Sequence, residues 1–237
     1  MISSYYVWKG RSVIDSKPIV LILSNVTRPS LNVKTGWEVQ AWIMREDIAP
    51  HKAVSTGDNR SVCGDCPLKP KLNGDNMCYV TTHQAPLSVW KSYKKGNIPY
   101  IKPKDFVNKY KRPLRQGAYG DPAFVPYEVW EELEKSTDKT GTSYTHQWKT
   151  DFFDERMKEF SMASVESLED KKLANAMDMR TYRMVSDVSE IEDDEIQCPN
   201  ETKGTLCADC GLCSGNRKGA KNIAIVPIKS AITNNRP

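Results

Sequence analysis

Apolar and polar positions follow one another along the chain in patterns that predict strands and helices. Pro18–Leu23 is a short aliphatic run, and Glu38–Met44 alternates apolar and polar residues, so both segments are expected to be strands. From residue 112 onward, strand-like and helix-like segments alternate at short spacing. The further expected strands are Leu114–Tyr119, Thr142–Trp148, Phe160–Ser164, Thr181–Ser186 and Asn222–Ile228, and the expected helices are Pro86–Lys95, Pro126–Lys135, Asp151–Lys158 and Leu168–Met177.

This order of elements is typical of βαβ units. It predicts an α/β fold with a parallel sheet, either open or bent into a partial (β/α) barrel. We expect a single domain over residues 1–237, with an N-terminal cysteine loop at 58–80 and a C-terminal cysteine loop at 198–214. Because crossovers in such folds are right-handed, the carboxyl ends of the strands should lie on one side.

The composition is that of an ordinary globular chain. Apolar residues make up 39% and charged residues 27% of the 237 positions, which argues against disorder or a coiled coil for the whole chain. The longest aliphatic run, Ile19–Leu23, is too short to span a bilayer. The N-terminus lacks the basic start and apolar stretch of a signal peptide. We therefore expect a cytoplasmic protein with no membrane partner.

Two charged stretches stand out against a net charge of only +4, which by itself does not indicate a nucleic-acid partner. Lys102–Arg115 holds six basic residues with Phe106 and Tyr110 among them, and Asp187–Glu195 holds six acids. Each is typical of a solvated loop. The basic stretch could instead contact the phosphates of a nucleic acid and stack its aromatic rings on bases.

Cysteine is the residue type that points most directly to chemistry. The number of cysteines is odd, and the chain shows no export signal. A metal or redox centre is therefore a better interpretation than a disulfide framework. Three cysteines fall within 16 residues and four within another 16. The seven are Cys63, Cys66, Cys78, Cys198, Cys207, Cys210 and Cys213.

The C-terminal group has the spacing Cys198-x8-Cys207-x2-Cys210-x2-Cys213. Successive two-residue gaps are typical of a [4Fe–4S] cluster, whose thiolates bind different iron corners. Structural zinc more often takes its ligands as separated pairs, although four cysteines could satisfy either metal. We expect a [4Fe–4S] cluster here, with zinc as the alternative.

The N-terminal group, Cys63-x2-Cys66-x11-Cys78, offers only three thiolates. It could form a second metal site or help to close the first. A fourth ligand could be His83, a cysteine of the other group or a small molecule bound at an open iron. A zinc knuckle completed by His83 or Asp65 is an equal alternative.

Several motifs outside and inside these loops carry a resemblance to a known family. They are Asn32-x-Lys34-Thr35-Gly36, the strand-like Val39–Met44, Cys78-Tyr79-Val80, Tyr119-Gly120-Asp121-Pro122-Ala123-Phe124, Tyr144-Thr145-His146, and the block from Cys198-Pro199 to Cys213. Together they resemble a bacteriophage family of unknown function called gene product 88, over about residues 32–228. The resemblance implies a phage origin and phage proteins as partners.

That family is in turn distantly similar to the radical S-adenosylmethionine enzymes. In those enzymes a cluster-binding loop follows the first strand of a partial (β/α) barrel, and here too cysteines follow a strand. Their motif is Cys-x3-Cys-x2-Cys, whereas this chain has gaps of two and eleven residues, and no glycine-rich motif follows Cys78. Both departures argue against S-adenosylmethionine as a cofactor.

If the strands are parallel, their carboxyl ends and the N-terminal cysteine loop should meet at one mouth. Asp121 and His146 are the candidate catalytic acid and base. The simpler alternative is that Asp121 caps a turn and His146 packs against Trp148. Asp187 follows the fourth of these strand ends, and the candidate cofactor-binding residues are Tyr119, Trp148, Ser164 and Ser186.

Two functions follow from these observations. The first is a phage-type iron–sulfur protein, with redox or radical-type chemistry at the mouth of the sheet. The alternative is a non-catalytic phage protein stapled by zinc that binds a nucleic acid through Lys102–Arg115 or binds another protein. A virion or assembly component with a purely structural cluster is a third possibility.

Overall fold

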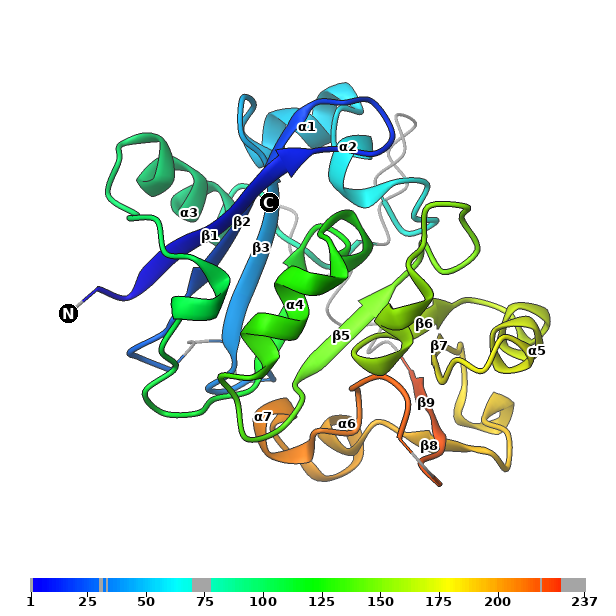
Figure 1. Ribbon diagram of the computed structural model, residues 1–237. Helices are drawn as coiled ribbons and strands as arrows, with labels where there is room; N and C mark the ends of the chain where they lie inside the picture. Colours follow the sequence, from blue (N-terminus) through cyan, green and yellow to red (C-terminus); the bar gives the residue numbers. More distant parts are fainter. Residues whose placement is uncertain (1, 30–31, 33, 70–77, 218, 227–237) are drawn as a thin grey trace, which may run out of the picture.

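One curved sheet organises the computed structural model, which describes residues 2–29, 32, 34–69, 78–217 and 219–226 (Figure 1). Within these residues the sheet has nine strands in the order β1-β2-β3-β4-β5-β6-β7-β9-β8. The strands are β1 (Ser4–Arg11), β2 (Pro18–Ser24), β3 (Val39–Arg45), β4 (Leu114–Tyr119), β5 (Thr142–Thr145), β6 (Met162–Val165), β7 (Thr181–Met184), β8 (Glu195–Gln197) and β9 (Asn222–Ile225).

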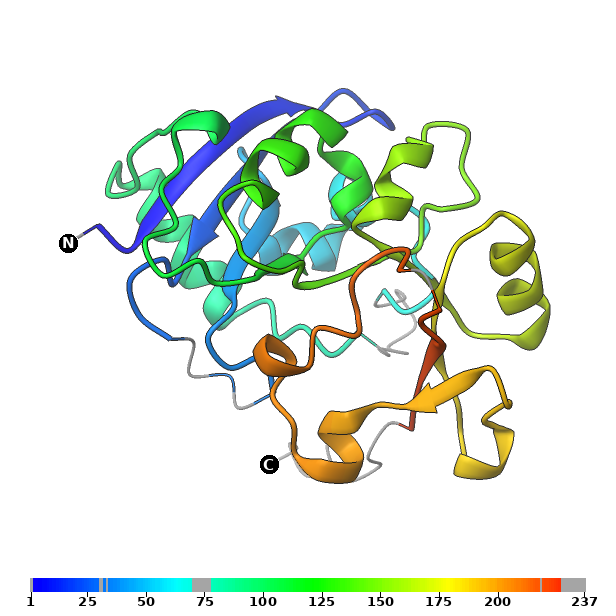
Figure 2. The same ribbon diagram turned by 60° about the horizontal axis from the view of Figure 1, so that its bottom comes forward.

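Short helices connect and cover these strands. Figure 2 shows α4 (green) and α5 (yellow) on the outside of the curved sheet. The C-terminal helices, in orange, lie along a different side, at the bottom of the view. The helices are α1 (Pro50–Thr56), α2 (Arg60–Cys63), α3 (Ala85–Lys94), α4 (Tyr127–Glu134), α5 (Leu168–Ala176), α6 (Pro199–Lys203) and α7 (Cys207–Cys210).

The predicted α/β class is confirmed, and the sheet is mostly parallel where a parallel sheet was expected. Every pair from β3 through β9, and the pair β8–β9, is parallel, whereas β1–β2 and β2–β3 are antiparallel. The sheet is not closed, because β1 and β8 stand at its two edges. Both faces of β3 are buried, as expected for a strand in the middle of such a sheet.

Most expected elements are present with boundaries shifted by a few residues. The expected helix at Asp151–Lys158 is wrong: this segment is a turn followed by a 3-10 turn at Glu155–Glu159, which Asp154 caps by accepting from Arg156 N. The expected strand Thr142–Trp148 ends at Thr145. The tail of the expected strand Asn222–Ile228 lies partly outside the described residues. The elements β1, α1, α2, β8, α6 and α7 were not expected.

Side chains of β4 and β5 alternate between two different environments. On one face Gln116 donates to Glu134 of α4 and accepts from Ser143. On the other face Arg115 donates to Tyr79, and Tyr144 contacts the Cys213 thiol. Successive residues of a strand point to opposite faces, so one face packs on the helical layer while the other turns toward both cysteine loops.

Candidate functional sites

The N-terminal cysteine loop is attached to the end of β5. Helix α2 ends at Cys63, and Gly64 caps it with φ +56°, a conformation that favours glycine. Gln147 Nε2 donates to the Cys63 carbonyl at 3.1 Å, and Cys66 N donates to the same carbonyl at 3.2 Å. The loop therefore reaches the carboxyl ends of the parallel strands, as predicted for the mouth of the sheet.

Tyr119, at the end of β4, lies beside the N-terminal thiols. Its hydroxyl is buried and has no hydrogen-bond partner among the residues that the structure describes. Burial raises its pKa well above the ordinary value, and the nearby Cys63 and Cys78 thiols raise it further. Burial likewise raises the pKa of Cys63 well above the ordinary value, with Cys66, Cys78 and Asp121 adding to the effect. The three thiols and the Tyr119 hydroxyl are therefore close enough to influence one another's pKa values.

His146, the first residue after β5, joins this group. Its Nδ1 lies 3.4 Å from Cys66 Sγ, and its Nε2 lies 2.8 Å from Glu166 Oε1. Burial lowers the pKa of His146, but the contacts with Cys66 and Glu166 outweigh burial and raise it to about 10. Sequence reasoning missed Glu166. Glu166 directly follows β6, just as His146 directly follows β5. This shared position at a strand end could have identified it from the sequence.

Asp121 holds these elements together and has no free carboxylate oxygen. Its Oδ1 accepts from Thr145 Oγ1 at 2.7 Å and from Ala123 N at 3.0 Å, and its Oδ2 accepts from His146 N at 2.8 Å. Its own N donates to the Val62 carbonyl at 2.7 Å. The expectation that Asp121 caps a turn is confirmed, and the carboxylate additionally fixes the backbone of His146.

The other residues expected at the mouth have separate surroundings. Trp148 is buried in a small apolar cluster with Ala163 and Val165, and its indole N–H donates to the Ser164 carbonyl. Ser164 is buried on β6. Ser186 N donates to Glu190, and Asp187 accepts from Ser189 N at the start of a 3-10 turn. Trp148 therefore belongs to the core, and no contact described here joins these residues to the thiols.

The four C-terminal cysteines line one small pocket together with Thr142, Pro199 and Leu212. Backbone hydrogen bonds fix this loop to the sheet: Cys207 N donates to the Lys34 carbonyl at 2.9 Å, and Ser143 N donates to the Cys213 carbonyl at 3.0 Å. The pocket volume of about 10 Å³ is room for about one water molecule. The four cysteine side chains therefore enclose little space in the described structure.

The thiols of this C-terminal group influence one another. Burial raises the pKa of Cys213 to about 12, and the nearby Cys198, Cys207 and Cys210 thiols contribute. Burial also raises the pKa of Cys207 to about 11, and the carboxylate of Glu38 adds to the effect. A bound metal would offset these costs, because it stabilises thiolates directly. The donor set therefore fits a thiolate-ligated metal centre.

The two cysteine groups lie at opposite ends of β5. Thr142, the first residue of that strand, lines the C-terminal pocket, whereas His146 contacts Cys66 just beyond the last residue. Four residue steps along a strand span about 13 Å. In Figure 1, α7 accordingly lies near the start of β5, and α2 lies toward its far end. The two groups of cysteines are therefore attached to opposite ends of the same strand.

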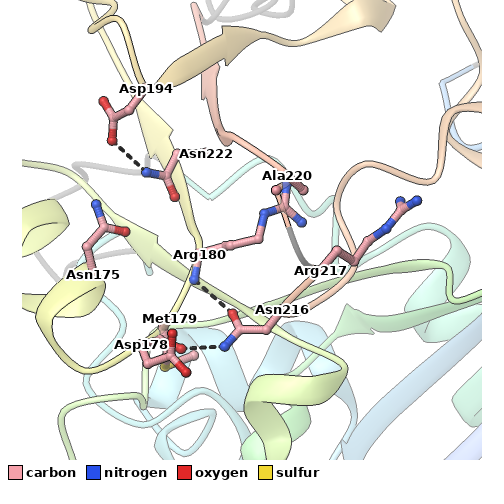
Figure 3. Close-up of a pocket in the computed structure, with 10 residues that line it drawn as sticks. Asn175, Asp178, Met179, Arg180, Asp194, Asn216, Arg217, Ala220 and Asn222 are labelled. Carbon is pink, nitrogen blue, oxygen red and sulfur yellow. Dashed lines mark hydrogen bonds between the residues drawn. The ribbon is translucent and has the colours of Figure 1, made fainter.

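A larger polar pocket, of about 540 Å³, lies beside the C-terminal cysteine loop, and some of its lining residues hold that loop in place (Figure 3). Arg180 lines it and donates to the carbonyls of Leu212, Ser214, Gly215 and Lys221. Asn216 in turn accepts from Arg180 N and donates to the Asp178 carbonyl. Arg180 therefore has a structural role: it ties the segment after Cys213 to β7.

The basic stretch Lys102–Arg115 does not present all of its charges to solvent. Arg112 is buried and donates to the Asn25 carbonyl, whereas the half-buried Arg115 donates to Gln40 and to the exposed Tyr79. Phe106 is also buried. The exposed cations of the stretch are Lys102, Lys104, Lys109 and Lys111. The surface available to a nucleic acid is therefore smaller than the sequence indicated.

The described part of the chain holds no group of three or more His, Cys, Asp or Glu side chains placed to hold a metal ion, and no disulfide joins any of its cysteines. Among its helices, none has the length and apolar character needed to cross a membrane. Comparisons with protein-family models, with curated proteins and with solved structures each found no match to this chain. The candidate function therefore depends on the residues themselves.

Proposed function

We propose that this chain is an iron–sulfur protein in which Cys198, Cys207, Cys210 and Cys213 bind a [4Fe–4S] cluster. The observation that carries the proposal is that all four cysteines line one pocket. Their two-residue gaps favour a cluster over a zinc ion, because each thiolate can reach its own iron corner. The resemblance to the gene product 88 family of bacteriophages supports the same centre and a phage origin.

Cys63, Cys66 and Cys78 form a second metal site in this proposal. Its place at the carboxyl ends of β4 and β5 supports a chemical role there, because (β/α) proteins build their sites at that end of the sheet. The cluster would supply one-electron chemistry, and Asp121 and Thr145 would hold the second site in position. Arg112 and Arg115 are held by the Asn25 carbonyl and the buried Gln40 side chain, which favours this proposal over a nucleic-acid-binding protein.

Reciprocal cysteine variants test the proposal in protein purified without oxygen. Iron, acid-labile sulfide, zinc and the visible spectrum are measured for the wild type, Cys210→Ser and Cys66→Ser. We expect brown wild-type protein, loss of the C-terminal cluster in Cys210→Ser, and retention of that cluster in Cys66→Ser. Colourless wild-type protein that contains zinc would overturn the cluster, and full metal retention in Cys210→Ser would overturn the ligand assignment.

A further inference from the structure

The three N-terminal thiols leave a fourth ligand position of a tetrahedral metal to be assigned, and the candidates named by sequence are poorly placed for it. His83 is exposed on the segment after Cys78. Asp65 is mostly exposed and forms ion pairs with Arg60 and Lys69. The C-terminal cysteines stand at the other end of β5, about 13 Å along the strand. None of these groups lies at the thiols as His146 does.

The spacing between His146 and Cys66 fits two ligands of one metal atom. A thiolate at 2.3 Å and an imidazole nitrogen at 2.0–2.1 Å from a tetrahedral ion stand about 3.5 Å from each other. The separation between Cys66 Sγ and His146 Nδ1 is 3.4 Å. The pair could therefore take up one metal atom with little movement of either side chain.

The other nitrogen of His146 has the partner that metal-binding histidines usually have. Nε2 lies 2.8 Å from Glu166 Oε1, and the His146 side chain is only 15% exposed. A ligating imidazole commonly donates its second N–H to a carboxylate, which fixes the tautomer and the ring orientation. With its proton on Nε2, His146 presents the lone pair of Nδ1 to the thiols.

A second, independent observation also points to a ligand at this place. The Tyr119 hydroxyl is buried without a hydrogen-bond partner, beside the Cys63 and Cys78 thiols. Leaving a buried hydroxyl without a partner destabilises the fold, so such groups usually face a ligand or water. Metal-bound thiolates are strong acceptors, so the Tyr119 O–H would have an acceptor once the site is loaded.

We propose that His146 is the fourth protein ligand of the N-terminal site, binding through Nδ1 the same metal atom as Cys66. Glu166 is a positioning residue that holds the imidazole in the ligating tautomer. This inference rests on the proposed function, in which Cys63, Cys66 and Cys78 bind metal. It assigns to His146 a ligand role in place of the acid–base role expected from sequence.

Cobalt binding to the full-length chain tests the assignment. Chelator-treated protein is titrated with Co²⁺ under argon, and the thiolate-to-cobalt absorption and the d–d bands are recorded. The signal of the N-terminal site is the part that Cys66→Ser loses. We expect His146→Ala to lose the same part, His146→Cys to recover it with shifted d–d bands, and Glu166→Gln to bind Co²⁺ 10–100-fold more weakly. The matched control His83→Ala should titrate like the wild type.

Nitrogen coupling gives a readout that folding defects do not imitate. Pulsed electron paramagnetic resonance of the cobalt-loaded protein, labelled with ¹⁵N-histidine, should show one directly coupled histidine nitrogen that is absent in His146→Cys. Unchanged Co²⁺ affinity in His146→Ala, with no coupled nitrogen in the wild type, would overturn the inference and leave a thiol–imidazole pair. If Cys66→Ser instead loses no cobalt signal, the second metal site of the proposed function fails, and the inference fails with it.

Discussion

Asp121 offers a sharp test of how the N-terminal site is held, because a single-atom change removes its charge and keeps its shape. Its carboxylate accepts two hydrogen bonds at Oδ1 and one at Oδ2, from Thr145 Oγ1, Ala123 N and His146 N. In Asp121→Asn one of the two oxygens becomes an NH₂ group. Whichever way the amide turns, Ala123 N or His146 N then faces a donor and loses its acceptor.

The expected cost follows from that count. Asp121 is only 7% exposed, so water does not readily replace the lost acceptor. A buried backbone N–H left without a partner costs about 1–3 kcal/mol. For a chain of this size, each kcal/mol corresponds to roughly 2–4 °C in Tm. We expect Asp121→Asn to lower the free energy of unfolding by about 1–3 kcal/mol. Urea denaturation of metal-loaded protein measures this change.

Asp187→Asn is the matched control for this measurement. Asp187 also accepts a backbone N–H two residues ahead, from Ser189 at 2.9 Å, but it does so at an exposed position. Water can replace that acceptor, so the expected change stays within about 0.5 kcal/mol. Equal unfolding curves for the two variants would refute the argument that burial of the Asp121 carboxylate network holds His146 in place.

Three further predictions concern other buried groups. Trp130→Ala should lower the free energy of unfolding by about 3–5 kcal/mol in urea denaturation, because the side chain is fully buried. Arg183→Met should cost about 1–3 kcal/mol in the same assay, because it removes both Arg183 hydrogen bonds to the fully buried Glu195 carboxylate and leaves Lys171, at 4.0 Å, as its ion-pair partner; an unchanged stability would contradict this. Burial raises the pKa of Glu38 to about 7, so its protonated form is favoured in the fold, and its contribution to stability is present below pH 4.5 and lost as the pH rises through 7. Glu38→Gln should therefore flatten the fall in Tm between pH 4.5 and 7, and an unchanged pH profile would contradict the role of this carboxyl.

Strongly patterned segments were predictable because local sequence and tertiary environment agree there. The apolar run of β2 is buried along its whole length, and the expected strand Leu114–Tyr119 coincides with β4. Short elements such as α2, with only four residues, carry no periodicity to detect. The expected helix at Asp151–Lys158 failed because Asp154 caps a 3-10 turn within it, ahead of a strand buried on both faces.

The sequence by itself determined which residues can form thiolate centres, because ligand spacing is a local property of the chain. It also indicated that strand ends would bear the functional side chains. Only the tertiary structure decided that Cys66 meets His146, since these residues lie 80 positions apart and are joined by the order of the parallel strands. Parallel pairing places the residues that follow β4, β5 and β6 at one edge, and the Asp121 network then fixes their distances.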